Sequence, residues 1–397
     1  MRLDDIRTMI SGTAGWPAVP GPLRVLHVLR QAAGGIFRHV VDLAEAQQKA
    51  GHQVGILCDS ASSDGSEGEE VLARLAPLLG FGLIRVGMRR AFAPANIMHT
   101  WALAHQIRLL NPDILHGHGP KGGVYARTIG TRLRASGSRV ARIYTPHGGS
   151  LHADWRTFRG RLTLRKERLL ARATDGFVFV SEFERDAFLA RVSKARRPLT
   201  VAHNGLKPGD FAPVAPTAGA RDFAFIGELS HRKGLDVFIG ALALMRHRSG
   251  SAPTAAIVGS GPDEQKYRTV VAELGLAEAV EFHAARPNRE AMTLAKTVVV
   301  PSRDESMPYF VLDAIAAGMP LVATRAGGIA EIFDAEADRL IAPGDAVALA
   351  DAMVAALAAP GAALAKAAAL NIRIRSTFTV EAMAATVESL YRTVTVG

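Results

Sequence analysis

The segment Pro301–Phe333 carries two carboxylates at a spacing that suits one shared ligand. Glu305 lies in a polar loop behind an apolar run, and Asp313 lies eight positions later in a stretch that is otherwise apolar and helical in pattern. Eight residues make about two turns of helix, so the two acids could approach one ligand from the same side. An unpaired carboxylate among apolar residues is costly, which makes Asp313 a candidate for ligand binding. Read alone, the pair could also be a helix cap and a surface carboxylate.

Two adjacent cations occupy a turn between a predicted strand and a predicted helix in GELSHRKGLDVFIGAL, residues 227–242. Arg232 and Lys233 stand close to the start of the helix, where the helix dipole favours acids rather than bases. An anion bound between the two side chains would explain this placement. A solvated pair of cations is the alternative.

Glycine turns between a strand and a helix offer a second kind of anion site, because backbone amides gather there at the positive end of the helix. Gly34 and Gly35 form such a turn behind the first predicted strand. Gly261 belongs to another, AAIVGSGPDE, but Glu264 stands where the dinucleotide fingerprint has its third glycine. A tight turn that needs glycine geometry explains this second case equally well.

Two histidines at close spacing raise the question of a metal. His116 and His118 lie two apart in DILHGH, but no Asp-x-Asp follows, and neither cysteine nor a further histidine lies nearby in the sequence. We therefore expect no metal and no other cofactor. His147, in TPHGGSLH, is a candidate contact for phosphate or acceptor, and a core or capping histidine is the alternative.

Alternating strands and helices must position these residues. Short β-rich runs alternate with longer helical ones, which is typical of parallel α/β sheets, and a helix is predicted from about Phe37 to Ala50. The predicted fold class is α/β, with two Rossmann-like doubly wound domains that face a central cleft and bind ligands at the carboxyl ends of their strands. The predicted strands are LRVLHVL, QVGILC, DILHGH, ARIYT and GFVFV in the first half, and FAFIG, AAIVG, AVEFH, TVVVP and PLVAT in the second.

A break in this pattern near Val201, rich in Pro, Gly and Ala, predicts the boundary between the domains. Residues 1–22 are expected to be a flexible lead-in, residues 23–203 an N-terminal domain and residues 204–378 a C-terminal domain. A last helix within residues 379–397 could return to the N-terminal domain.

The composition is typical of soluble globular proteins. The 397 residues are 48% apolar and 21% charged, unlike a disordered chain. A single cysteine, Cys58, excludes an internal disulfide and fits a reducing compartment. No apolar stretch reaches the roughly 18–20 residues needed to span a bilayer, and the start holds no apolar block of a secretory signal. We therefore expect a cytoplasmic protein.

Positive charge is concentrated in the first half. Residues 1–200 hold 29 Lys and Arg against 16 Asp and Glu, which gives +13, whereas the remainder holds 18 against 21, which gives −3. The run Arg156–Arg172 has seven cations and one acid, with an apolar side that includes Phe158. It could attract anionic lipid headgroups or a lipid-linked diphosphate, or be a solvated helix. Nucleic acid is disfavoured, because the run lacks interleaved aromatics and no nucleic-acid motif occurs elsewhere.

The ordered motifs resemble those of the retaining nucleotide-sugar glycosyltransferases of family 4 (glycosyl transferases group 1), which have the GT-B fold. Their Glu-x7-Glu motif, small-residue helix, Gly-x-Pro strand and Gly-Gly-x-x-Glu turn correspond here to Glu305-x7-Asp313, Ala314–Ala317, Gly318-Met-Pro320 and Gly327-Gly328-Ile-Ala-Glu331. Upstream landmarks match in the same order, at Gly34–Gly35, Asn204–Gly205 and Lys233–Gly234. The resemblance runs from about Leu23 to Phe333.

The resemblance implies a donor site for a nucleoside diphosphate sugar in the C-terminal domain. Lys233 would bind the diphosphate and stabilise the leaving group as negative charge grows, Glu305 would hold sugar hydroxyls, and Asp313 would hold the ribose. The donor-binding set implied in this way is Gly34, Gly35, Arg232, Lys233, Gly261, Arg286, Glu305, Ser306, Met307, Pro308, Tyr309 and Asp313.

Catalytic roles are implied for His118, Lys233 and Glu305, with His118 at the reacting face, and the family needs no protein nucleophile. The acceptor would bind the N-terminal domain, through residues that include His147, Arg156 and Arg159. By the same resemblance the setting is bacterial surface polysaccharide or exopolysaccharide assembly. The acceptor would be a lipid-linked saccharide, and the protein could be peripheral at the inner face of the plasma membrane.

Two departures from the family pattern keep alternatives open. Glu228 replaces the arginine of the family's Gly-Arg-Leu turn, which pairs with the lysine on the diphosphate, and Arg232 is a candidate substitute. Asp313 stands where the family has a glutamate that is one methylene longer. The competing interpretations are a nucleotide-sugar epimerase on the same fold and a non-catalytic relative that binds glycan or lipid.

Overall fold

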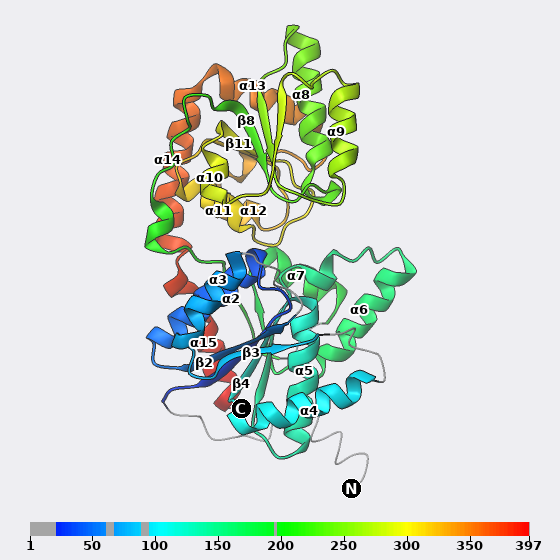
Figure 1. Ribbon diagram of the computed structural model, residues 1–397, viewed down its shortest axis with the longest axis vertical. Helices are drawn as coiled ribbons and strands as arrows, with labels where there is room; N and C mark the ends of the chain where they lie inside the picture. Colours follow the sequence, from blue (N-terminus) through cyan, green and yellow to red (C-terminus); the bar gives the residue numbers. More distant parts are fainter. Residues whose placement is uncertain (1–20, 61–66, 89–94, 194–196, 397) are drawn as a thin grey trace. The chain divides into compact units, whose positions relative to one another are not determined.

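A computed structural model describes residues 21–60, 67–88, 95–193 and 197–396 (Figure 1). The chain forms two compact units, of which one contains the residues up to Gly205 together with those from Val380 onward, and the other contains Leu206–Thr379. Most of the predicted lead-in, residues 1–20, lies outside the described residues. Each unit has its own parallel sheet and its own hydrophobic core.

The first unit is built on seven parallel strands in the order β3-β2-β1-β4-β5-β6-β7. Its central strands are buried on both faces, which explains why they read as continuous apolar runs in the sequence. The strands are β1 (Arg24–Val28), β2 (Gln53–Asp59), β3 (Gly82–Val86), β4 (Ile114–His118), β5 (Ala141–Thr145), β6 (Gly176–Phe179) and β7 (Leu199–Val201).

Helices cover both faces of this sheet (Figure 1). They are α2 (Gly34–Lys49), α3 (Glu67–Leu75), α4 (Ala95–Leu110), α5 (Gly119–Ala135), α6 (Phe158–Ala171), α7 (Glu182–Arg191) and α15 (Val380–Val396). Successive strand residues point to opposite faces, so Val25 packs toward α2 and α15, whereas Leu26 packs toward α4 and α5. A side chain's position along its strand therefore decides which helices it meets.

The last helix, α15, belongs to the first unit although it follows the whole of the second. It lies beside α2, and its residues Val387, Leu390 and Tyr391 are buried in one core cluster with Val25 and Ile143 (Figure 1). The chain therefore passes between the units twice, once after Gly205 and once after Thr379.

The second unit is built on five parallel strands in the order β10-β9-β8-β11-β12. Its strands are β8 (Arg221–Ile226), β9 (Ala255–Val258), β10 (Val280–His283), β11 (Ala295–Val300) and β12 (Leu321–Ala323). Its helices are α8 (Leu235–Ser249), α9 (Glu264–Glu273), α10 (Asn288–Met292), α11 (Tyr309–Ala316), α12 (Ile329–Phe333), α13 (Ala346–Ala358) and α14 (Pro360–Thr377). The main core cluster joins β8, β9, α8 and α13 through large side chains such as Phe225, Phe238 and Leu349.

The ten strands that the sequence predicts are present, and two parallel-sheet α/β units of Rossmann type are confirmed. The apolar pattern does not predict β3 or β7, because every residue of these strands is only partly buried. The predicted start of the first helix, near Phe37, is wrong: α2 begins at Gly34, so the glycine pair forms its first turn.

None of the described helices is, on its own, both long and apolar enough to cross a membrane. Only as a pair do α13 and α14 reach that length and composition, and they are bent by 104° at the break between them. Leu349 and Met353 of α13 are buried in the core of the second unit.

Candidate functional site

Each sheet has one place where the chain leaves two neighbouring strands in opposite directions. This switch point lies between β1 and β4 in the first unit and between β8 and β11 in the second. In α/β proteins, ligands bind at the carboxyl ends of the strands at such points. Four of the predicted residues follow or end these four strands, namely Gly34, His118, Lys233 and Glu305.

The turn that carries Arg232 and Lys233 is a short 3-10 helix, His231–Lys233, between β8 and α8. Gly234 ends it in the left-handed region, with φ +73°, and a Cβ at this position would collide with the backbone oxygen of Pro301. Only glycine tolerates both this conformation and this close approach. Gly234 therefore lets the cation-bearing turn lie directly against the end of β11.

Glu305 is the group on which the two cations converge. Its buried carboxylate lies 2.5 Å from Lys233 Nζ and accepts a hydrogen bond of 2.8 Å from Ser302 Oγ. Arg232 Nη1 lies 3.9 Å from the other carboxylate oxygen. Although adjacent in sequence, Arg232 and Lys233 thus direct their charges to one place, as recognition of a diphosphate would require.

Glu228, which replaces the arginine of the family pattern, pairs with Arg232. Its Oε2 lies 3.3 Å from Arg232 Nη2 and accepts a hydrogen bond of 3.2 Å from Ser230 Oγ. The side chains of Glu228 and Arg232 are 49% and 43% exposed, and an exposed pair of this kind contributes little stability. A bound anion could therefore draw Arg232 away from Glu228 at small cost.

Arg303 fixes the same turn from the β11 side. Its guanidinium binds both oxygens of Asp236, at 2.6 and 2.7 Å, and donates to the backbone oxygen of His231 at 2.8 Å. Its backbone amide donates to the oxygen of Arg232 at 2.9 Å. Partial burial would raise the pKa of Asp236, but the Arg303 contacts outweigh it and hold this pKa below its usual value. Arg303 and Asp236 are thus positioning residues, which the sequence motifs did not indicate.

The loop behind Glu305 is held by the glycine turn before α12. The backbone oxygen of Ser306 accepts a hydrogen bond of 3.1 Å from the Gly328 amide. Met307 and Tyr309 are buried, whereas Ser306 and Pro308 are partly exposed. The predicted sugar-binding segment therefore has a fixed backbone and two partly exposed positions.

Asp313 is buried in α11, and its Oδ2 accepts a hydrogen bond of 2.9 Å from Asn288 Nδ2 at the start of α10. Asn288 explains how a carboxylate is tolerated in an apolar helix. No motif pointed to it, although a polar residue directly after Arg286 and Pro287 could have been considered.

Gly261 and Arg286 lie at the same edge of the sheet but farther from the switch point. Gly261 follows β9, where a Cβ would collide with the backbone of Leu229. Arg286 is exposed after β10, and burial together with this nearby guanidinium lowers the pKa of His283.

In the first unit, the glycine turn and the end of β4 lie in contact. Gly34 is the first residue of α2, with φ +73°, and both it and Gly35 are exposed. A Cβ on Gly119, directly after His118, would lie only 3.1 Å from Ile36 Cδ1. The first turn of α2, through the Ile36 side chain, thus lies close to the end of β4.

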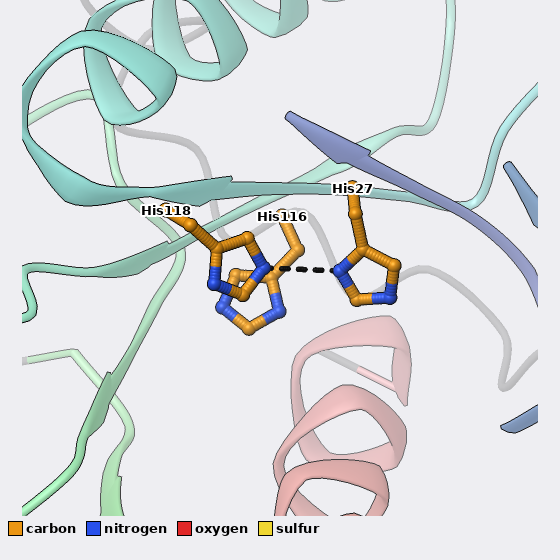
Figure 2. Close-up of side chains that lie close together, drawn as sticks. All are labelled: His27, His116 and His118. Atoms are coloured by element: carbon orange, nitrogen blue, oxygen red, sulfur yellow. Dashed lines mark hydrogen bonds between the residues drawn. The ribbon is translucent and has the colours of Figure 1, made fainter. Parts of the chain in front are cut away.

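His118 belongs to a cluster of five histidines, formed by His27, His39, His116, His118 and His147. The register of β1 and β4 places His27 beside His116, and all three strand histidines point to the side of the sheet where α15 lies (Figure 2). His118 Nε2 lies 3.0 Å from His27 Nδ1, and its Nδ1 lies 3.2 Å from His147 Nε2. The structure thus brings together His118 and His147, two of the predicted site residues, with His116, which was weighed only as a metal ligand, and with His27 and His39, which were not predicted.

Polar side chains orient these rings. His27 Nε2 lies 2.8 Å from Gln47 Oε1, and His39 Nδ1 lies 2.9 Å from Asn204 Oδ1. His116 is held at both nitrogens, by Tyr391 Oη of α15 at 2.6 Å and by Thr145 Oγ1 at 2.8 Å.

The whole cluster is held uncharged. Burial, with a smaller repulsion from its neighbours, lowers the pKa of His27 to about 4, and burial lowers the pKa of His39 to about 4. Burial, again reinforced by the surrounding histidines, lowers the pKa of His116, His118 and His147 well below the usual value. All five imidazoles are therefore neutral near pH 7, so each has a free or hydrogen-bonded lone pair.

The other two predicted acceptor residues lie elsewhere on the first unit. Arg156 and Arg159 are exposed on the segment that leads into and begins α6. Two residues of the predicted apolar side are exposed as well, Phe158 at 75% and Leu169 at 64%, and so is the preceding Trp155 at 56%. The surface is hollowed here, and the lining residues are Trp155, Arg161, Leu162, Leu164, Arg165, Lys166, Arg168, Leu169 and Arg172.

Known protein families match both units of the chain. The model of Glycosyltransferase Family 4 matches residues 33–209, and that of Glycosyl transferases group 1 matches residues 220–359. Glycogen synthase of Mycobacterium tuberculosis is 26% identical over 392 residues, which cover 90% of this chain and 91% of that protein. A putative glycosyltransferase of Bacillus subtilis, EpsD, is 29% identical over 281 residues, or 66% of this chain and 72% of that protein.

Solved structures show the same fold. Sucrose-phosphate synthase from Thermosynechococcus elongatus has a TM-score of 0.76 at 22% identity. The match covers 93% of this chain and 98% of the synthase chain. HepE of Anabaena in complex with UDP has a TM-score of 0.71 at 19% identity, and the match covers 92% of this chain and 99% of the HepE chain. The architecture of each unit is therefore that of the GT-B glycosyltransferases.

Proposed function

This chain belongs to the family 4, group 1 glycosyltransferases, and from that membership we propose that it transfers a sugar from a nucleoside diphosphate sugar to an acceptor hydroxyl with retention of the anomeric configuration. The observation that carries the proposal is the convergence of Arg232 and Lys233 on Glu305 at the switch point of the second unit. This arrangement offers two cations to a diphosphate and a carboxylate to the sugar beside it.

The two cations would act on the leaving group. Lys233 Nζ has three donors, and Glu305 and a phosphate oxygen can share them. Negative charge grows on the diphosphate as its bond to the sugar breaks, so Lys233 and Arg232 would bind the transition state more strongly than the ground state. Arg232 would exchange its exposed pairing with Glu228 for the diphosphate.

Retention would follow from attack on the face that the diphosphate leaves. The acceptor oxygen forms a bond to the anomeric carbon, the bond from that carbon to the phosphate oxygen breaks, and the acceptor proton passes to the departing oxygen. This route needs no nucleophile from the protein. Glu305 would hold sugar hydroxyls, and Asp313, oriented by Asn288, would accept hydrogen bonds from the ribose.

The acceptor is proposed to be a lipid-linked saccharide of surface polysaccharide assembly, reached on the cytoplasmic side of a membrane. The hollow over α6 supports this, because exposed Trp155 and Leu169 lie there among four arginines and Lys166. Such a surface suits an anionic bilayer, where each cation near the surface contributes about 1 kcal/mol. Vesicles with anionic phospholipid should bind the protein and zwitterionic vesicles should not. Equal binding to both would remove the membrane part of the proposal.

A screen of nucleoside diphosphate sugars tests the donor assignment. UDP-sugars come first, because HepE has been solved with UDP and glucose. We expect one donor to bind and to be slowly hydrolysed, and the product anomer, followed by NMR, to match that of the donor. Binding of no donor to the wild type would contradict the proposal. Conversion of donor into another nucleotide sugar without acceptor would instead favour an epimerase.

A further inference from the structure

Three histidine nitrogens of the first unit converge at the carboxyl edge of its sheet. The nitrogens that His39, His118 and His147 can offer lie within 4.8 Å of one another. His118 Nδ1 and His147 Nε2 are 3.2 Å apart. Two nitrogens bound to one tetrahedral zinc ion at 2.0–2.1 Å would lie about 3.3 Å apart. The present separation is therefore close to the one that a shared ion would impose.

The surrounding hydrogen bonds fix where the lone pairs of His39 and His118 lie. Asn204 Oδ1 can only accept, so it fixes the proton of His39 on Nδ1 and leaves the lone pair on Nε2. Gln47 Oε1 likewise fixes the proton of His27 on Nε2, so His27 Nδ1 accepts from His118 Nε2. The lone pair of His118 is then on Nδ1, the nitrogen that faces His147. Metal-binding histidines are characteristically oriented by such outer hydrogen bonds.

His39 supplies an independent observation. Its ring is fully buried, and its Nε2 has no hydrogen-bond partner among the described residues. The His147 ring meets it edge-on, with 4.7 Å between the ring centroids. A buried nitrogen without a partner is costly unless something binds it.

The backbone around His147 is held in a strained form. His147 has φ +51°, which is unusual for a residue with a side chain, and Gly148 follows with φ +77°. Buried Glu184 accepts a hydrogen bond from the Gly148 amide and another, of 2.9 Å, from the Val180 amide. A strained backbone that its neighbours enforce is typical of functional sites.

We propose that His39, His118 and His147 bind one zinc-type divalent cation, with water at the fourth position. Three neutral imidazoles with an open position are a ligand set that zinc takes in proteins. His147 is the most exposed of the three ligands, so the open position lies on its side. The expectation of no metal came from spacing along the sequence, which carries no information on three ligands from α2, β4 and the loop after β5.

The neighbouring group His27, His116 and His118 is the competing site. It is less suited, because both nitrogens of His116 already have partners in Thr145 and Tyr391. A metal there would have to displace one of these hydrogen bonds deep inside the unit.

Metal binding by the full-length wild-type protein tests the proposal directly. After chelation, the protein should take up one Zn²⁺ per chain in competition with a chromophoric chelator. Co²⁺ should give the intense visible absorption of a tetrahedral site. A folded wild-type protein that takes up no Zn²⁺, or a weak octahedral Co²⁺ spectrum, would overturn the proposal and leave the histidines as a hydrogen-bonded row.

Variants assign the ligands, with thermal unfolding of each variant measured in parallel. His39→Gln and His147→Asn should each weaken Zn²⁺ binding about 100-fold or more, and Asn204→Ala about 10-fold, as loss of an outer hydrogen bond does. Asparagine is chosen at position 147 because it tolerates positive φ. His283→Asn, in the other unit, should leave Zn²⁺ binding unchanged. Loss of binding in His116→Gln with binding retained in His39→Gln would overturn the assignment in favour of the competing group.

Discussion

At the carboxyl edge of its sheet, the second unit gathers charged side chains, whereas the first gathers neutral ones. Lys233 and Arg232 direct their charges to the carboxylate of Glu305. Arg303 and Asp236 form a further ion pair that supports their turn. In the first unit, four buried histidines and the partly exposed His147 occupy the equivalent place, and desolvation keeps them uncharged. The same topology thus supports two kinds of polar site, one suited to an anion and one suited to a ligand that seeks lone pairs.

Removing the central charge of the second unit should have the largest effect on activity. Lys233→Ala should lower kcat/KM for donor turnover about 100- to 1,000-fold, because it removes a charge that acts on the leaving group. Steady-state kinetics with the donor found in the screen measures this. Lys266→Ala, an exposed lysine of α9, is the matched control and should have wild-type kinetics. Similar losses in both variants would contradict a specific role for Lys233.

Burial in the first unit should keep the Cys58 thiol uncharged, as it keeps the clustered histidines uncharged. Burial, which outweighs the nearby Arg85, raises the pKa of Cys58 from 9.0 to about 11. At pH 8 the thiolate fraction is then about 100-fold lower than in the unfolded chain, and thiolate is the form that reacts. Alkylation by iodoacetamide, followed by mass spectrometry, should be slower in the native protein by at least that factor. Equal rates before and after unfolding would show that the thiol is not held in this way.

The ribose assignment should appear as a moderate effect on donor affinity. Asp313→Ala should weaken donor binding about tenfold, the loss of one charge-assisted hydrogen bond. Calorimetric titration with the donor measures it. Asp351→Ala removes an exposed carboxylate of α13 and should leave affinity unchanged. Asp313→Asn keeps an acceptor for Asn288, so it separates loss of that contact from loss of the ribose contact. Unchanged affinity in Asp313→Ala would rule out the ribose role.

The smallest effect is expected for loss of the Tyr391 hydroxyl, which forms a hydrogen bond with His116 of the histidine cluster. Tyr391→Phe should lower the free energy of unfolding by about 1–2 kcal/mol, because His116 Nδ1 would remain buried without its partner. Tyr267→Phe, in the other unit, is a matched control, since the buried Tyr267 hydroxyl has no partner among the described residues. Denaturant unfolding of both variants measures the difference. Equal stabilities would show that the Tyr391 contact contributes nothing.

The sequence predicted the charged site better than the neutral one, for a physical reason. Lys233 and Glu305 lie in turns directly after two strands, and strand ends can be located from apolar runs. Their convergence then follows from parallel strand order. The partner of Asp313 could not be predicted in this way, because Asn288 comes from a different turn and its contact depends on how α10 packs.

The histidine cluster escaped prediction because its contacts depend on register and long-range packing. His27 lies beside His116 only through the pairing of β1 with β4. The Tyr391 hydroxyl that holds His116 is 275 residues away in sequence. His39 and Asn204 are separated by 165 residues. Local spacing, on which the expectation of no metal rested, contains none of this information.

The place of α15 has a consequence for biosynthesis. Because Val387, Leu390 and Tyr391 complete the core over Val25 and Ile143, the first unit lacks one wall until the ribosome has translated past residue 391. The second unit, Leu206–Thr379, has all its residues earlier and can fold while the first unit is still incomplete. The unit whose synthesis begins first can therefore complete its core only after the whole second unit has been synthesised.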